Sequence, residues 1–178
     1  YYVNAASGND NNPGTEFLPW RTIQKAANTM LAGDTVIVKA GTYNERVYET
    51  TSGNYGIFIT YQANPGDLVK ISEGFVLSGN YIKLNGFKIT CTNSGDDWEG
   101  CIHISGDYCE IENCTIEDAE RPGIITTYMA DNCTIKNNTI KRCLLNGIEL
   151  YGRNHLVKNN EIDDIRDKVG NITRNDAN

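Results

Sequence analysis

The feature that most constrains the fold is a loose repeat of 22 to 27 residues in the later part of the chain. Each copy contains a glycine that precedes an apolar-x-apolar segment, and each copy closes on an isoleucine. The glycines are Gly74, Gly100, Gly123 and Gly147, followed by Gly170. The isoleucines are Ile89, Ile116, Ile140 and Ile162. Because two independent markers give one period, we interpret the copies as structural units of one kind.

Within a copy, apolar and polar side chains alternate over three to five residues, as they do from Cys109 to Asn113. This alternation is typical of β-strands and not of helices. Leucine-rich repeats share the period, but they require a leucine scaffold and a helical segment that these copies lack. The sequence therefore predicts an all-β fold, a right-handed single-stranded parallel β-helix with three short strands per turn of 22–27 residues.

In such a solenoid, equivalent residues of successive turns stack about 4.8 Å apart and form columns. The predicted columns are Ile82, Cys109, Cys133 and His155, then Leu84, Ile111, Ile135 and Val157, then Gly86, Asn113, Asn137 and Asn159. Asparagine tolerates the left-handed geometry of a tight corner and can bond neighbouring corners, so we expect the third column to be a buried asparagine ladder. The alternative role, glycosylation of N-x-T triplets, conflicts with burial. We expect His155 to be a core or end-turn residue.

The N-terminal region, residues 1–43, lacks the repeat and is predicted to contain a strand and a capping α-helix. The apolar stripe of this helix is Ile23, Ala26, Ala27, Met30 and Leu31. Such an amphipathic helix can cover the open edge of the first turn. Residues 44–178 are assigned to the turns of the β-helix, within one domain overall. Because no second apolar helix follows, we expect the turns to continue beyond the chain end, or an uncapped last turn to make end-to-end contacts.

The composition excludes some partners. The chain has 16 Lys and Arg against 23 Asp and Glu, a net charge of −7, so we expect no nucleic-acid partner. No run of 18 apolar residues occurs, so we expect no membrane insertion. The opening segment is rich in Asn, Gly and Ser, and we interpret it as the start of a secreted or cell-surface protein.

The six cysteines do not follow the spacing of a structural zinc site. Cys109 and Cys133 occupy equivalent positions in two copies and are expected to be stacked free thiols in the core. Cys91 and Cys101 flank a polar loop and are the best candidates for a disulfide.

The opening segment from Tyr1 to Tyr43, together with "YQANPGDLVKIS" and "FVLSGNYIKLNGFKIT", resembles the N-terminal part of secreted right-handed β-helix proteins of the pectate-lyase-like group. It is especially similar to polysaccharide lyases of family nine. The resemblance implies cleavage of acidic polysaccharide by β-elimination, with a calcium ion held by aspartates and a lysine as base. The Asp-Asp-Gly-x-x-Asp-like context of that family is not found in this sequence, so the resemblance assigns no catalytic residue.

The chemistry of β-elimination suggests which residues to consider. A uronate must have its carboxylate neutralised, for which Ca²⁺ is suited, and a base must lie near the adjacent proton. Outward positions beside the glycines, and the loops before them, should share one edge of the coil. The candidate catalytic residues are Lys168, Arg121 and His103. The candidate substrate-binding residues are Trp98, Glu149 and Arg166. The candidate calcium ligands are Asp96, Asp97, Glu99, Asp163, Asp164 and Asp167.

Each candidate also has a purely structural interpretation, because charged loops are commonly solvated surface and Trp98 can anchor its loop. Two functions therefore stay open. The first is a carbohydrate-active enzyme, a lyase that acts on uronate-containing polysaccharide. The alternative is a non-catalytic glycan-binding or structural β-helix of the adhesin or tail-spike type, or a fragment that lacks the catalytic turn. Since one fold hosts both, the site must decide.

Overall fold

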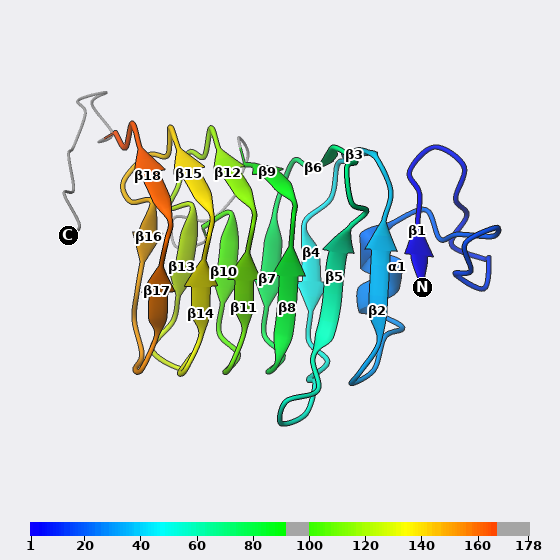
Figure 1. Cartoon of the computed structure of the whole chain (residues 1–178), viewed down its shortest axis with the longest axis horizontal. Helices are drawn as coiled ribbons and strands as arrows, with labels where there is room; N and C mark the ends of the chain where they lie inside the picture. Colours follow the sequence, from blue (N-terminus) through cyan, green and yellow to red (C-terminus); the bar gives the residue numbers. More distant parts are fainter. Residues whose placement is uncertain (92–99, 167–178) are drawn as a thin grey trace.

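The computed structural model of the protein describes residues 1–91 and 100–166 and forms a parallel β-helix whose turns stack along one axis (Figure 1). In each turn the chain passes through a seven-stranded sheet, then a six-stranded sheet, then a five-stranded sheet. Neighbouring strands pair in parallel. The predicted all-β solenoid with three short strands per turn is therefore confirmed.

The three sheets are built from strands of two to five residues. The seven-stranded sheet contains β1 (Tyr2–Val3), β2 (Thr35–Val38), β5 (Ile59–Ala63), β8 (Ile82–Asn85), β11 (Glu110–Glu112), β14 (Thr134–Lys136) and β17 (Leu156–Lys158). The six-stranded sheet contains β3 (Gly41–Tyr43), β6 (Val69–Ile71), β9 (Lys88–Thr90), β12 (Thr115–Glu117), β15 (Thr139–Lys141) and β18 (Glu161–Asp163). The five-stranded sheet contains β4 (Val47–Glu49), β7 (Phe75–Leu77), β10 (Ile102–Ile104), β13 (Ile124–Thr126) and β16 (Ile148–Glu149). Because β2 and β3 already belong to these sheets, the coil begins within residues 1–43.

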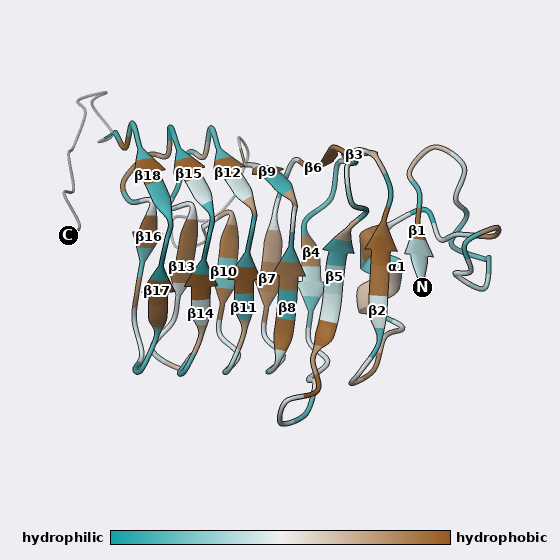
Figure 2. Cartoon of the chain, in the orientation of Figure 1, coloured by the Kyte–Doolittle hydropathy of each residue, from teal (hydrophilic) through white to brown (hydrophobic). Residues whose placement is uncertain are grey.

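The register of the strands confirms the predicted stacking. Leu84, Ile111 and Ile135 are direct partners in β8, β11 and β14, and all three are fully buried. The closing isoleucines stack in the order Ile89, Ile116, Ile140 and Ile162. Figure 2 shows apolar residues recurring in the adjacent strands β8, β11, β14 and β17. Each fully buried isoleucine contributes roughly 1.5–3 kcal/mol to folding, so the inner columns supply most of the driving force.

The third predicted column has the expected backbone but not the expected burial. Asn113, Asn137 and Asn159 have φ between 54° and 56°, and Gly86 has φ 83°. However, Asn113 and Asn137 are exposed, and the Asn113 amide donates to Asn85 Oδ1 (2.9 Å) at the corner of the preceding turn. The prediction that these asparagine side chains are buried is wrong, because the left-handed residue at each corner turns its side chain outward.

One position later, Asn138 is buried and Asn160 is partly buried. The Asn138 side chain is almost fully buried, and its Oδ1 accepts from the Cys114 backbone N–H (2.9 Å). Its Nδ2 donates to Asn160 Oδ1 (2.9 Å), and Asn160 Nδ2 in turn donates to the Ile135 carbonyl (2.9 Å). These amides satisfy backbone groups that the corners leave unpaired.

His155 stacks beside Cys133 as predicted. Its Nδ1 accepts from the Cys133 backbone N–H (3.2 Å), and its Nε2 lies 2.6 Å from the Tyr151 carbonyl. Both ring nitrogens therefore face backbone groups. All six cysteines are buried free thiols, so the disulfide considered for Cys91 and Cys101 is not formed.

The helix α1 (Ile23–Ala27) covers one end of the coil, beside β4 (Figure 1). Four residues of the predicted stripe are buried, namely Ile23, Ala26, Ala27 and Met30. Leu31 is 66% exposed, so its assignment to the apolar stripe of the helix is wrong. The helix is shorter than predicted, and the turn that follows it is fixed by Asp34, whose Oδ2 accepts from the Leu31 N–H (2.8 Å). No helix in the described part of the chain is long and apolar enough to span a membrane.

The cap protects the exposed edge of β4 with a side-chain amide. Gln24 Oε1 accepts from the Tyr48 backbone N–H (2.8 Å), and Gln24 Nε2 donates to the Tyr48 carbonyl (3.0 Å). One glutamine therefore pairs with the strand as a neighbouring peptide group would, which blocks edge-to-edge association at this position.

Candidate functional site

The first candidate surface is the outer face of the five-stranded sheet. Its central column, defined by the strand register, contains Tyr48, Val76, His103, Ile125 and Glu149. The sequence predicted outward positions for His103 and Glu149, and the structure places both in this one column. The two residues are two strands apart, a separation of about 10 Å. They are therefore too distant to form a direct acid-base pair, and a ligand would have to bridge them.

Glu149 is held in place by two side-chain hydrogen bonds. Its Oε1 accepts from the Tyr151 hydroxyl (2.6 Å), and its Oε2 accepts from Asn146 Nδ2 (3.0 Å). The hydrogen bond to Glu149 raises the pKa of Tyr151. The Tyr151 ring lies 4.5 Å from that of Tyr128, which is 81% exposed. Glu149 is thus a positioned acceptor beside the partly buried Tyr151 and the exposed Tyr128, a combination suited to sugar hydroxyls.

Arg121 lies in the loop between β12 and β13. We call the row of loops that connect the six-stranded to the five-stranded sheet the leading edge. There the Pro122 carbonyl accepts from the Cys101 N–H (3.0 Å), and the Gly123 N–H donates to the Asn146 carbonyl (3.0 Å). A Cβ on Gly123 would lie 2.8 Å from the Gly147 carbonyl oxygen, which explains glycine at this repeated position. The backbone contacts place Arg121 on the turn next to the one that carries Asn146 and Glu149.

Asp163 is the last residue of β18, and Asp164 and Arg166 follow it at the leading edge. Arg166 forms a two-pronged ion pair with Asp164, with Nη2 to Oδ2 at 2.6 Å and Nε to Oδ1 at 2.9 Å. This pair lowers the pKa of Asp164. Asp163 Oδ1 accepts from the Asp164 backbone N–H (2.8 Å). These charged side chains therefore bind one another locally. Arg166, predicted to bind substrate, already has a carboxylate partner.

The predicted residues Asp96, Asp97, Trp98, Glu99, Asp167 and Lys168 lie outside the described residues. Within 1–91 and 100–166, no group of three or more His, Cys, Asp or Glu side chains could hold a metal ion. Asp163 and Asp164 by themselves therefore do not fit a calcium centre, which takes six to eight oxygen ligands.

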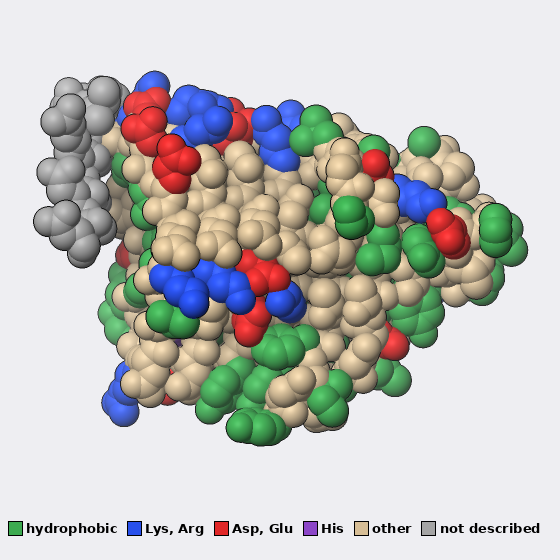
Figure 3. Space-filling model, in the orientation of Figure 1, with side chains coloured by type: hydrophobic (Ala, Val, Ile, Leu, Met, Phe, Trp, Pro, Cys, Tyr) green, Lys and Arg blue, Asp and Glu red, His purple; other side chains and the backbone are tan. Residues whose placement is uncertain are grey.

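Two charged clusters on the outer surface were not predicted from the sequence. On the seven-stranded sheet, Glu112 pairs with Lys83 (2.7 Å) and Lys136 (2.9 Å), and this row is visible on the front of β8, β11 and β14 (Figure 3). On the six-stranded sheet, Glu117 pairs with Lys88, Lys141 (3.3 Å) and Arg142 (3.1 Å). The sequence does contain a signal for both clusters, because residues of opposite charge occupy outward positions one repeat apart.

Replacing Glu117 by glutamine is expected to lower the free energy of unfolding by roughly 1–2 kcal/mol at pH 7, because its side chain is only 8% exposed and faces three cations. The bond with Lys88, above all, lowers the pKa of Glu117. This contribution is present above the ordinary glutamate pKa of about 4.3 and is lost as the pH falls through the lower folded value.

Urea unfolding of Glu117→Gln and the wild type at pH 7 and pH 3 measures this difference. The control is Glu161→Gln, an exposed glutamate in the same sheet. If Glu117→Gln lost the same unfolding free energy at pH 7 and at pH 3, the stabilising role of the ionised Glu117 would be contradicted.

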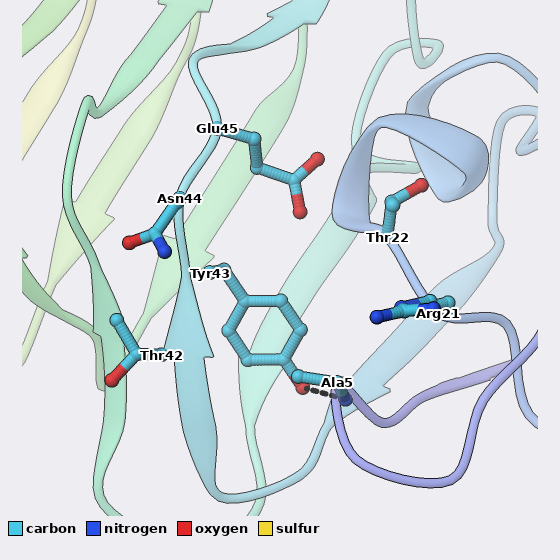
Figure 4. A pocket seen from close by; sticks show the side chains of 7 residues that line it. All are labelled: Ala5, Arg21, Thr22, Thr42, Tyr43, Asn44 and Glu45. Carbon is cyan, nitrogen blue, oxygen red and sulfur yellow. Dashed lines mark hydrogen bonds between the residues drawn. The ribbon is translucent and has the colours of Figure 1, made fainter.

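The second candidate is a pocket of about 280 Å³ between the cap and the coil (Figure 4). Its lining residues are Ala5, Arg21, Thr22, Thr42, Tyr43, Asn44 and Glu45. The Glu45 carboxylate accepts from the N–H groups of Ile23 and Gln24 (both 2.9 Å), and burial raises its pKa. The Tyr43 hydroxyl accepts from the Ala5 N–H (3.2 Å) and donates to the Lys39 carbonyl (2.9 Å). These polar groups hold the cap onto the coil, so we interpret the pocket as a structural seam.

Comparisons with known proteins show the family and the fold of this chain. The family described as "Pel9A-like, right handed beta helix region" matches residues 1–168. The uncharacterized protein YwoF of Bacillus subtilis (strain 168) is 28% identical over 141 residues, which cover 79% of this chain and 28% of YwoF.

Two solved structures share the fold. XylC in complex with xylose superposes with a TM-score of 0.80 at 17% identity, over 91% of this chain and 53% of XylC. Pectate lyase Pel9A superposes with a TM-score of 0.75 at 17% identity, over 94% of this chain and 51% of the lyase. The chain therefore spans about half the length of these structures and less of YwoF.

Proposed function

Because this chain belongs to the family of Pel9A-like right-handed β-helix proteins, we propose that it is part of a carbohydrate-active protein, secreted or held at the cell surface. Its ligand is uronate-containing polysaccharide, and its reaction is β-elimination. The observation that supports this proposal best is the gathering of His103, Arg121 and Glu149 on one outer face and its leading edge.

In the proposed reaction, a base removes the proton adjacent to the uronate carboxylate. The bond to the glycosidic oxygen at the next carbon then breaks, a carbon-carbon double bond forms, and the leaving oxygen takes up a proton. Arg121 would pair with the substrate carboxylate, and Glu149 would accept from sugar hydroxyls. His103 or Lys168 would serve as base.

A calcium ion, where bound, would neutralise the substrate carboxylate and offset the net charge of −7. The acidic residues that remain to complete its ligand set are Asp96, Asp97, Glu99 and Asp167, outside the described residues. Since the described acids do not form a calcium site by themselves, we assign no step to the ion.

The alternative function is a non-catalytic glycan-binding module. It is favoured by one observation, the distance of about 10 Å that the fold sets between the outward groups of His103 and Glu149. Binding of polymer without any product would support this alternative.

Replacing Arg121 by alanine is expected to lower kcat/KM on polygalacturonate about tenfold or more, because a charged hydrogen-bond partner of the substrate carboxylate is lost. The ultraviolet absorbance of the unsaturated uronate product measures the rate, with calcium and with chelator. Polygalacturonate, alginate and chondroitin are compared.

Arg153→Ala is the matched control, since Arg153 is an exposed arginine in the loop after β16, at the other edge of the five-stranded sheet. Equal rates for both variants would remove Arg121 from the site. The absence of both product and binding for all three polymers would contradict the proposed function itself.

A further inference from the structure

The structural seam explains only part of the pocket between the cap and the coil. Glu45 and Tyr43 hold the cap with their hydrogen bonds. Three other lining residues, Arg21, Thr42 and Asn44, are exposed. In the described part of the chain, no hydrogen bond or ion pair engages the Arg21 guanidinium, the Thr42 hydroxyl or the Asn44 Nδ2 group. The seam therefore does not require these polar groups.

The N-terminal region covers the edges of two of the three sheets at this end of the coil. On the seven-stranded sheet, the Asn4 N–H donates to the Trp20 carbonyl (2.8 Å) and the Trp20 N–H donates to the Tyr2 carbonyl (3.0 Å), which covers β1. On the five-stranded sheet, Gln24 pairs with the backbone of Tyr48 in β4. The six-stranded sheet ends at β3, and among the described strands β3 pairs with β6 alone.

The free edge of β3 faces the pocket. On the β6 side, the Gly41 N–H donates to the Leu68 carbonyl (3.2 Å), and the Tyr43 carbonyl accepts from the Ser72 N–H (3.1 Å). In a parallel pair, alternate residues of a strand bond to the same neighbour, so the N–H and the carbonyl of Thr42 point away from β6. Because Thr42 lines the pocket, its peptide groups are open to a ligand there.

The groups around the pocket combine hydrogen-bond donors and acceptors in a small space. The donors are the Arg21 guanidinium, the Asn44 amide and the Thr42 N–H, and the acceptors are the Thr42 carbonyl and the Glu45 carboxylate. Figure 4 shows the Arg21 side chain extending from the cap toward the Tyr43 ring of the coil. The volume of about 280 Å³ is close to the lower end of the range for small-molecule sites, so it suits a ligand of one ring.

The charges near the pocket favour an uncharged ligand. Arg21 and Glu45 line it with opposite charges. The Asp10 carboxylate lies beside them, because its Oδ1 accepts from the Arg21 N–H (2.8 Å) and its Oδ2 accepts from the Thr22 hydroxyl (2.8 Å). A uronate would add another carboxylate next to these two. The hydroxyl groups of a neutral sugar can instead donate to Glu45 and accept from Arg21. A peptide strand would need a longer free edge than the one residue Thr42.

We propose that the pocket between the cap and β3 binds one neutral pyranose unit through Arg21, Thr42, Asn44 and Glu45. This inference goes beyond the proposed function, because the ligand is uncharged and no bond is broken. The pocket lies at the loop after β3, whereas Arg121 lies in the loop after β12, three turns further along the leading edge. Three strand spacings separate the two loops by about 14 Å, so the two sites can be tested one at a time.

NMR titration of the ¹⁵N-labelled 178-residue chain with xylose, galactose, glucose and galacturonate tests this site. We expect at least one neutral sugar to shift the backbone amide signals of Thr42, Asn44 and Glu45, with a Kd of about 1–10 mM. Galacturonate should bind more weakly. Arg21→Ala should raise the Kd about tenfold, because a charged donor is lost, and Asn44→Ala should raise it about threefold. Since both side chains are exposed, the melting temperature should change by less than about 3 °C.

Arg153→Ala serves as the control, because Arg153 is an exposed arginine in the loop after β16, near the other end of the coil; its affinity should equal that of the wild type. If none of the neutral sugars shifted the three amide signals at about 50 mM, or if only signals of the outer face shifted, the pocket would not be a sugar site. Unchanged affinity in both Arg21→Ala and Asn44→Ala, or tighter binding of galacturonate than of every neutral sugar, would equally overturn the proposal. The lyase assay has a separate readout, so either proposal can fail alone.

Discussion

Replacing Gly106 by alanine is expected to lower the free energy of unfolding by about 3 kcal/mol or more. The added Cβ would lie 2.0 Å from the carbonyl oxygen and 2.5 Å from the carbonyl carbon of Gly79. Both atoms belong to the backbone of the adjacent turn and cannot rotate away. The substitution must therefore push two turns apart, which disturbs the pairing of β8 with β11 next to the corner.

The control separates steric contact from backbone strain. Gly56 has φ 69°, and no atom lies within 4 Å of a Cβ built on it. Alanine there should cost only about 1–2 kcal/mol, the penalty of a left-handed conformation. Urea unfolding followed by circular dichroism measures both variants. Equal losses for Gly106→Ala and Gly56→Ala would show that the close approach of the turns is not what requires glycine at position 106.

The fold was predictable because, in a β-helix, residues that pair between neighbouring strands are separated by one period of the sequence repeat. Ile111 and Ile135 are neighbours in space because they are equivalent in the repeat, and a strand period of two decides which side is buried. The same logic fails at corners, where the left-handed φ of Asn113 turns its side chain outward. It also fails at Leu31, since periodicity does not show where a short helix ends.

The candidate site was less predictable for a different reason. Placing His103 and Glu149 in one column required only the repeat. Which charged side chains pair with one another depends on how far they extend, and the repeat does not show this. Arg166 and Asp164 were both candidates for binding a ligand, but they pair with each other.

Replacing Tyr61 by phenylalanine is expected to destabilise the protein by about 2–4 kcal/mol at pH 7. Tyr61 and Glu49 are fully buried inside the coil, and the Tyr61 hydroxyl donates to the Glu49 carboxylate. The other carboxylate oxygen accepts from the Thr51 N–H (2.7 Å). Phenylalanine would leave a buried carboxylate with one donor fewer. Tyr43→Phe is the control, because the buried Tyr43 hydroxyl bonds only uncharged backbone groups, so its loss should cost about 1 kcal/mol.

The same pair predicts how stability depends on pH. Burial raises the pKa of Glu49, although the bonds from Tyr61 and Thr51 oppose the shift. A raised folded pKa means that the folded state holds the proton more tightly than the unfolded state. This contribution to stability is fully present below the unfolded value of about 4.3 and declines as the pH rises through the folded value.

Unfolding free energies measured at pH 5 and pH 8 should therefore fall more steeply in the wild type than in Glu49→Gln, which has no proton to lose at this position. Glu45 also has a raised pKa and is present in both proteins, so only the difference between the two slopes reports on Glu49. The double variant Tyr61→Phe/Glu49→Gln should lose less than the sum of the single variants, because each removes the same bond. Two results together would contradict this account: equal pH slopes for the wild type and Glu49→Gln, and a stability loss in the double variant equal to the sum of the single losses. They would mean that water solvates the Glu49 carboxylate, although the packing around Glu49 excludes water.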